Sequence, residues 1–330
     1  MLPYKRDSLS SPRVILLDGL WGSGKSLLAP IVSTLDGVSP FRIESQPEVI
    51  THMLARNRLT DNVFKFLFLN SVIERSYAAS IGREVNLRIW DDSSYFQTLG
   101  LWEILKRLAS KSSVRDFPDG LARPEAYFQL THLLTQSAES LLRVLPGLVT
   151  VINIQRNPAF LFSHWEKYLR HWDRERELTL AVEFQEAKVP FFAEQWAEEW
   201  VSLSLAERSA LAVARCASYE RNALARIGNP RESVYTVYFE DLLTAPEKVL
   251  LRLSGNLEKE FSSATKRKVD RLAQNSGHRR NKLRPEGIEG ARDVVLNKIR
   301  NTTSAEVYEE FYHSVREFED SKSSHGEVTE

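Results

Sequence analysis

Cysteine is almost absent from this sequence of 330 residues, in which Cys216 is the one example. A single thiol excludes a disulfide within the chain, and we expect Cys216 to be a small residue packed in a helix. An excess of either charge is also missing, because 44 Lys and Arg residues balance 44 Asp and Glu residues. The net charge of zero excludes long-range attraction to nucleic acid, so any anion must be bound by a local arrangement of residues.

Long hydrophobic runs are missing as well, and the longest apolar runs fall well short of a membrane span. Residues 1–13 are polar and contain no apolar segment followed by a cleavage site. Hydrophobic residues at 42% and charged residues at 27% are typical of soluble globular proteins. We therefore expect a cytoplasmic protein with no integral membrane segment and no nucleic-acid partner.

The order of apolar patterns predicts the fold class. Residues 14–17 form a short β-branched run typical of a buried parallel strand, and residues 26–35 continue with helical spacing. Further strands are predicted at 84–94, 147–155 and 233–243, with helices at 49–80, 95–109, 124–145, 159–172, 192–202, 205–227 and after Pro246. Alternating strands and helices predict a three-layer α/β fold of P-loop type, with a central mainly parallel sheet and helical insertions.

The length favours one domain over residues 1–320. We expect helical insertions at about 95–130 and 165–225 to build a pocket for a substrate, because both stretches combine helical patterns with aromatic and polar residues. Residues 321–330 are polar, and we expect them to form a disordered tail.

A glycine-rich loop carries the clearest chemical signal. Residues 19–26 read GLWGSGKS, which satisfies the pattern G-x-x-x-x-G-K-[ST] between a predicted strand and a predicted helix. Glycines let successive backbone N–H groups point inward, the helix N-terminus adds positive potential, and Lys25 adds a mobile charge. The loop therefore predicts a phosphate site made of Gly22, Ser23, Gly24, Lys25 and Ser26, without deciding which nucleotide is bound.

A second anion site is predicted at the end of another strand. The segment VTVINIQRNP at 149–158 delivers Arg156 at its carboxyl end, and the following helix bears Ser163. Ligands of open α/β sheets bind at the carboxyl ends of the strands, so Arg156 and the glycine loop should share one edge.

These segments together resemble the sulfotransferase family, whose members use 3′-phosphoadenosine 5′-phosphosulfate as the donor of a sulfuryl group. The resemblance rests on Arg-Asn-Pro after a strand, YFEDLLTAPEKV at 238–249, YFQLTHLL at 127–134 and SGHRRNKLRPEG at 276–287, in the family's order. It implies transfer of a sulfuryl group to a hydroxyl or amine of a small molecule, sugar or lipid, with no metal ion. It covers the loop and much of 124–290.

The resemblance also implies roles for individual residues. Lys25 and the loop amides would stabilise the leaving 5′-phosphate, and His132 would take the proton of the acceptor. Four side chains would hold the 3′-phosphate, namely Arg156, Ser163, Arg279 and Arg280.

Two departures from the family pattern stand in the sequence. A Lys or Arg precedes the Ser-Gly pair in the family and threonine follows it, whereas here Gly22 precedes Ser23 and Gly24, and Lys25 follows. The family's serine lies one residue further from its arginine than Ser163 does from Arg156, and His164 occupies that spacing.

Carboxylates leave other functions open. Asp91 and Asp92 close a predicted strand, and an ATP-dependent kinase would use one of them on magnesium or as a base, with Ser26 on the metal. In a sulfotransferase, Glu44 or Asp92 could instead contact the acceptor, so the base stays open between these two and His132. A non-catalytic nucleotide-binding module is the second alternative. The sequence identifies neither the acceptor nor the oligomeric state.

Overall fold

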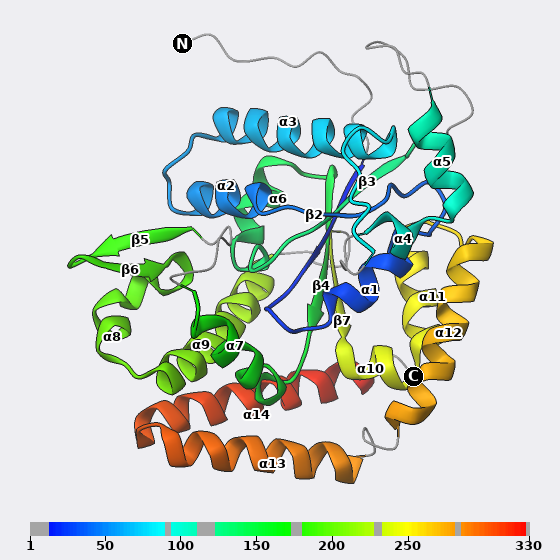
Figure 1. Cartoon of the computed structure of the whole chain (residues 1–330). Coiled ribbons are helices and arrows are strands. Elements are labelled where there is room, and N and C mark those ends of the chain that lie inside the picture. Colours follow the sequence, from blue (N-terminus) through cyan, green and yellow to red (C-terminus); the bar gives the residue numbers. More distant parts are fainter. Residues whose placement is uncertain are drawn as a thin grey trace.

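The first predicted strand lies in the middle of a five-stranded parallel sheet (Figure 1). The computed structural model describes residues 13–89, 94–110, 123–172, 180–227, 233–280 and 285–327. The strand order is β2-β3-β1-β4-β7, and every neighbouring pair is parallel. The strands are β1 (Arg13–Asp18), β2 (Arg42–Ile43), β3 (Ala126–Leu130), β4 (Val149–Gln155) and β7 (Val234–Tyr238).

Alternation along β1 separates the two faces of this sheet. Ile15 and Leu17 pack with α1 (Lys25–Val32), α10 (Phe239–Thr244), α11 (Pro246–Asn256) and α12 (Ser263–Arg280). Val14 and Leu16 pack on the other face with α2 (Gln46–Ala55), α3 (Asp61–Ser80) and α6 (Ala138–Val144). Helices therefore cover both faces, which confirms the predicted three-layer α/β fold with a parallel sheet.

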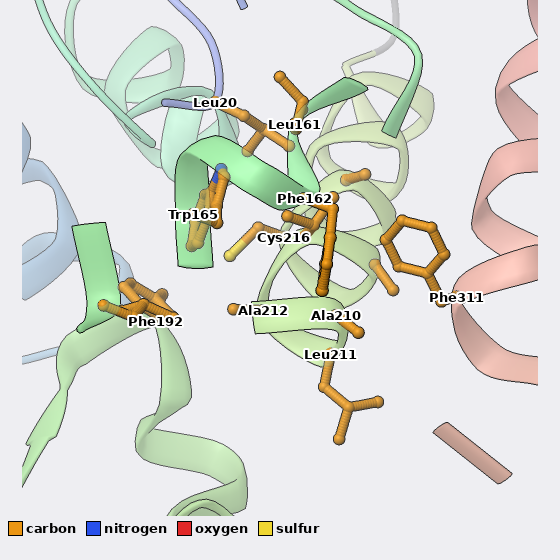
Figure 2. Packing of buried hydrophobic residues seen from close by; sticks show 14 of the residues in the cluster. Leu20, Leu161, Phe162, Trp165, Phe192, Ala210, Leu211, Ala212, Cys216 and Phe311 are labelled. Atoms are coloured by element: carbon orange, nitrogen blue, oxygen red, sulfur yellow. The ribbon is translucent and has the colours of Figure 1, made fainter. Parts of the chain in front are cut away.

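A third apolar cluster lies among helices beyond the sheet (Figure 2). It is formed by α7 (Phe162–Leu169), η3 (Phe191–Trp196), α8 (Ala197–Ser202), α9 (Leu205–Arg226), α13 (Pro285–Thr302) and α14 (Ala305–Glu327), beside the hairpin β5 (Ala181–Phe184) and β6 (Ala187–Pro190). α9 begins at a capping box in which Ser204 and Glu207 bond reciprocally to each other's backbone N–H. Cys216 of α9 is fully buried in this cluster, as predicted, and burial raises the pKa of its thiol.

The predicted helix at 124–145 is wrong over its first part. Residues 126–130 form β3, and a 3₁₀ turn η1 (Thr135–Ser137) separates that strand from α6. All five β3 residues are buried, and a short buried strand cannot be distinguished from a buried helix by periodicity. The insertion expected at 95–130 consequently ends earlier, and its described helices are α4 (Tyr95–Thr98) and α5 (Leu101–Ala109).

Two other expectations also differ from the structure. Residues 84–89 of the strand predicted at 84–94 form no strand, and Leu87 and Ile89 are exposed, so the apolar run joins no ladder. Asp91 and Asp92 lie outside the described residues. The chain beyond 320, expected to be disordered, continues α14 to Glu327, where the Tyr238 hydroxyl lies within hydrogen-bond distance of Ser321.

Short elements complete the carboxyl edge of the sheet. η2 (Pro158–Phe160) follows β4, and its cap Asn157 accepts a hydrogen bond from Ala159 N–H. The predicted strand at 233–243 ends at Tyr238, after which the chain enters α10 directly. Over the described ranges, no helix is both long enough and apolar enough to cross a membrane.

The core predicts a measurable difference between two leucines. Leu17 is fully buried in β1, whereas Leu251 on α11 is 53% exposed. Leu17→Ala should lower the free energy of unfolding by about 2–5 kcal/mol, because a buried cavity is created. Leu251→Ala should change it by about 0.5 kcal/mol or less. Urea denaturation of both variants measures the difference, and equal effects would contradict the proposed central position of β1.

Candidate functional site

The glycine loop lies at the carboxyl edge of the sheet, between β1 and α1. Gly19 has φ of 139°, and a Cβ placed there would lie 2.3 Å from the Ile154 carbonyl oxygen of β4. Only glycine permits both this backbone conformation and this approach. Gly24 ends the loop as the N-cap of α1, whose first N–H groups have no acceptor within the helix. The sequence therefore builds a turn that offers backbone donors to an anion.

Lys25 lies inside this turn. Its side chain is buried, and its Nζ donates hydrogen bonds to the carbonyl oxygens of Gly19 and, at 2.8 Å, Leu20. Burial lowers the pKa of Lys25 to about 8, against the opposing attraction of Asp18 above all. The ammonium group is thus solvated by its own loop and can exchange these carbonyls for an anionic oxygen.

Asp18 ties the exit of β3 to the exit of β1. Its Oδ1 accepts a bond of 2.8 Å from the Thr131 hydroxyl, and its Oδ2 accepts bonds from the Thr135 N–H and hydroxyl at 2.7 and 2.6 Å. These bonds hold residues 131–135 against the loop. His132 lies in that stretch, directly after β3.

His132 is placed beside the cationic groups of the site. Burial is the largest cause that holds the pKa of its imidazole well below the usual range. The charges of Lys25 and His164 lower this pKa further. Its backbone N–H donates to the Glu48 Oε2 at 3.1 Å. A neutral imidazole near Lys25 can accept a proton from a bound hydroxyl or amine.

Two buried acids near Lys25 were missed in the sequence. Burial, followed by the charge of Asp18, raises the pKa of Glu48 on α2 and of Glu220 on α9 well above the usual range. Glu48 follows Ser45 and Pro47 in a pattern typical of an exposed helix start, and Glu220 sits in a charged helical run. No local signal places either beside the loop, because α2 and α9 reach it only through the tertiary fold.

Arg156 reaches back from the end of β4 to the loop. Its Nη1 donates to the Gly22 carbonyl oxygen at 2.8 Å, and its guanidinium carbon lies 4.6 Å from the centre of the Phe239 ring. Burial lowers the pKa of Arg156, against the charge of Glu240. Among the described residues, neither Arg156 Nε nor the buried Ser23 Oγ has a hydrogen-bond partner. Unpartnered buried donors are unusual and mark a place where a ligand or water completes the arrangement.

α7 presents His164 to the loop. A Cβ added to Gly22 would lie 3.1 Å from the His164 Cγ, so the imidazole ring packs directly against this glycine. Ser163 is exposed one position earlier on the helix. The residue at the spacing of the family's serine is therefore the one that contacts the loop.

α7 also braces the loop through tryptophan. Trp165 Nε1 donates to the Trp21 carbonyl oxygen at 3.0 Å, and the two indole rings are 4.6 Å apart. The Tyr168 ring lies 4.2 Å from Trp21. Figure 2 shows Trp165 on α7 near Leu20 of the loop. The aromatic side chains thus anchor the loop in the third apolar cluster.

The remaining candidates are ion-paired, exposed or not described. Glu44 accepts bonds from Arg42 and Arg75 at the end of β2, so its carboxylate is committed to two ion pairs. Ser26 is exposed in the first turn of α1. Arg279 and Arg280 end α12, and their side chains are outside the described part of the structure, as is Asp92. Within the described ranges, no group of three or more His, Cys, Asp or Glu residues is arranged to hold a metal ion.

Comparisons with known proteins give structural likeness only. No family model and no curated protein matches the chain. The sulfotransferase domain of the Synechococcus PCC 7002 olefin synthase is 12% identical, with 96% of this chain and 98% of that chain covered at a TM-score of 0.40. A sulfotransferase from Alicyclobacillus acidocaldarius is 12% identical, with 81% and 93% covered at 0.38. The sulfotransferase domain from the curacin biosynthetic pathway is 14% identical, with 77% and 76% covered at 0.36. TM-scores this low carry no argument about function, so the function must be supported by the residues of this chain.

The close approach at Gly19 predicts the effect of one methyl group. Gly19→Ala should lower the free energy of unfolding by more than about 1 kcal/mol, because the backbone of β4 blocks the new Cβ and φ is positive. Gly255→Ala on α11 is the control, since its Cβ meets nothing within 4 Å. That change should stabilise the protein by about 0.5–1 kcal/mol. Thermal and urea unfolding test the pair, and a neutral Gly19→Ala variant would contradict the described loop.

Proposed function

We propose that the protein is a sulfotransferase that moves a sulfuryl group from 3′-phosphoadenosine 5′-phosphosulfate to a hydroxyl or amine. The observation that carries this proposal is the position of Arg156, which bonds Gly22 of the loop while its Nε has no partner among the described residues. A phosphate loop alone suits many nucleotides. A second cation on the loop's rim suits a nucleotide with a separate phosphate away from the 5′ chain.

The residues present fit such a donor. Ser23 Oγ is a free buried donor inside the loop, and the N–H groups at the start of α1 lack helical acceptors. Lys25, Ser23, Gly24 and Ser26 would hold the 5′-phosphosulfate end. The 3′-phosphate would be held by Arg156, with Arg279 and Arg280 as further proposed ligands.

Lys25 and His132 would then have separate roles in the transfer. The donor, when bound, supplies an activated sulfuryl group and a leaving phosphate on which charge develops. Lys25 would turn from the carbonyls of Gly19 and Leu20 toward that charge and stabilise it. A ring nitrogen of His132 would accept the acceptor's proton as its oxygen or nitrogen bonds to sulfur. The carboxylate of Glu44 is engaged in two ion pairs, so we assign the proton transfer to His132.

The acceptor could belong to several classes of compound. A small molecule, a sugar or a lipid would suit the chemistry, and we retain the sequence-based expectation of a cytoplasmic protein. A small-molecule kinase is the second candidate, because Ser26 directly follows Lys25 and is exposed at the start of α1, where a hydroxyl can bind magnesium.

Removing Arg156 separates the two candidates. Calorimetric titration with 3′,5′-adenosine bisphosphate in EDTA should show binding that weakens by about 10- to 100-fold in Arg156→Ala, the value of one charged hydrogen bond or more. Arg226→Ala, which removes an exposed arginine paired with Glu139, is the matched control and should bind normally. Magnesium-dependent ATP binding that ignores the Arg156 substitution would instead support the kinase.

A further inference from the structure

His164 occupies an unusual place for an exposed helix residue. Its ring packs on Gly22, the same residue whose carbonyl oxygen accepts the Arg156 hydrogen bond of 2.8 Å. Arg156 comes from the end of β4 and His164 from the first half of α7. The imidazole and the guanidinium therefore meet one residue of the loop from two elements.

Among the described residues, the charged groups that act on His164 are cations. They are Lys25 on α1, Arg156 after β4 and Lys167 on α7 itself, and the neighbouring His132 after β3 adds a second imidazole. Partial burial is the largest cause that lowers the pKa of His164 below its ordinary value. The charges of Lys25, Arg156 and Lys167 lower it further. In the ligand-free protein, burial and these positive charges therefore disfavour the protonated form of His164.

We propose that His164 takes up a proton when a phosphate-bearing nucleotide binds on the loop, so that its imidazolium becomes part of the anion site. The inference rests on the proposed function, since it concerns the donor held by the same loop. An anion placed beside Lys25, Arg156 and His164 offsets the repulsion that disfavours the imidazolium. A serine, which occupies this spacing in the resembled family, cannot be charged in this way.

The sign of the pH dependence follows from the two states of His164. Below the ligand-free pKa the imidazole is protonated with or without ligand, and the contribution of His164 to affinity is greatest. Between the ligand-free and the ligand-bound pKa, binding takes up a proton and affinity falls as pH rises. Above about pH 8 Lys25 also begins to lose its proton in the free protein, which adds a second, separate decrease.

The experiment measures proton uptake directly. Adenosine 3′,5′-bisphosphate is titrated into the full chain in EDTA near pH 7, in buffers of different ionisation enthalpy, which gives the protons exchanged per ligand. The comparison is between wild type and His164→Gln. His313→Gln is the control, because His313 lies on α14 with its side chain 73% exposed. The ligand's own phosphate titrates near pH 6 and contributes equally to all variants.

Wild type and His313→Gln should take up more protons than His164→Gln, and the affinity of His164→Gln should vary less between pH 6 and 7.5. The imidazole resonance of His164, followed by NMR in wild type, should titrate at higher pH once the bisphosphate is bound. His132→Gln distinguishes the second imidazole, since it should keep the uptake that His164→Gln loses. Tight binding with equal proton uptake in wild type and His164→Gln would overturn this inference and leave the proposed function standing. Absence of bisphosphate binding would overturn both.

Discussion

A buried ammonium group controls the arrangement of this site. Among the residues that the structure describes, Lys25 has no carboxylate as a direct partner and is instead solvated by the carbonyl oxygens of Gly19 and Leu20. A charge removed from water is costly unless it is compensated, and two carbonyl dipoles compensate it only partly. The ammonium therefore favours an incoming anion. Burial lowers the pKa of Lys25 and raises the pKa of Glu48 and Glu220, so it disfavours the charged form of all three groups.

The shape of the loop depends on one stretch of chain. The Ile154 carbonyl requires glycine at position 19, Arg156 bonds the Gly22 carbonyl, and the indole of Trp165 bonds the Trp21 carbonyl. All three contacts come from residues 154–165, which run from β4 into α7. The segment that supplies the second cation thus also holds the phosphate loop in place. Binding of a phosphate at the loop and at Arg156 is consequently expected to be coupled, because neither arrangement is independent of the other.

The parts of the fold that could be predicted are those with a local signal. The loop at 19–26, the strand ending before Arg156 and the strand ending at Tyr238 each combine a β-branched run with a characteristic exit. β3 was misread because its residues are buried on both faces and its five positions fit a helix equally well. The tail was misread because α14 is stabilised by packing on α9, which composition does not reveal.

The site itself was predictable only in part. The positions of Lys25 and Arg156 at one edge follow from the rule that ligands bind at the carboxyl ends of parallel strands. The strand before His132 was not predicted, so only the family resemblance pointed to His132. Glu48 and Glu220 could not be predicted, because helices far apart in sequence bring them together. The only sequence signal for the contact of His164 with Gly22 is the spacing of His164 from Arg156. The structure is needed to show that His164 packs against the loop.

The most direct measurement compares two nucleotides that differ by a single phosphate. Dissociation constants for adenosine 5′-monophosphate and adenosine 3′,5′-bisphosphate, measured in EDTA with the same wild-type protein, report whether a separate 3′-phosphate is recognised. Binding of the bisphosphate tighter by about 30-fold or more, equivalent to about 2 kcal/mol, is expected if Arg156 and its neighbours form that second site. Equal constants would mean that the loop binds a nucleotide without reading its 3′ position, which would contradict the sulfotransferase assignment.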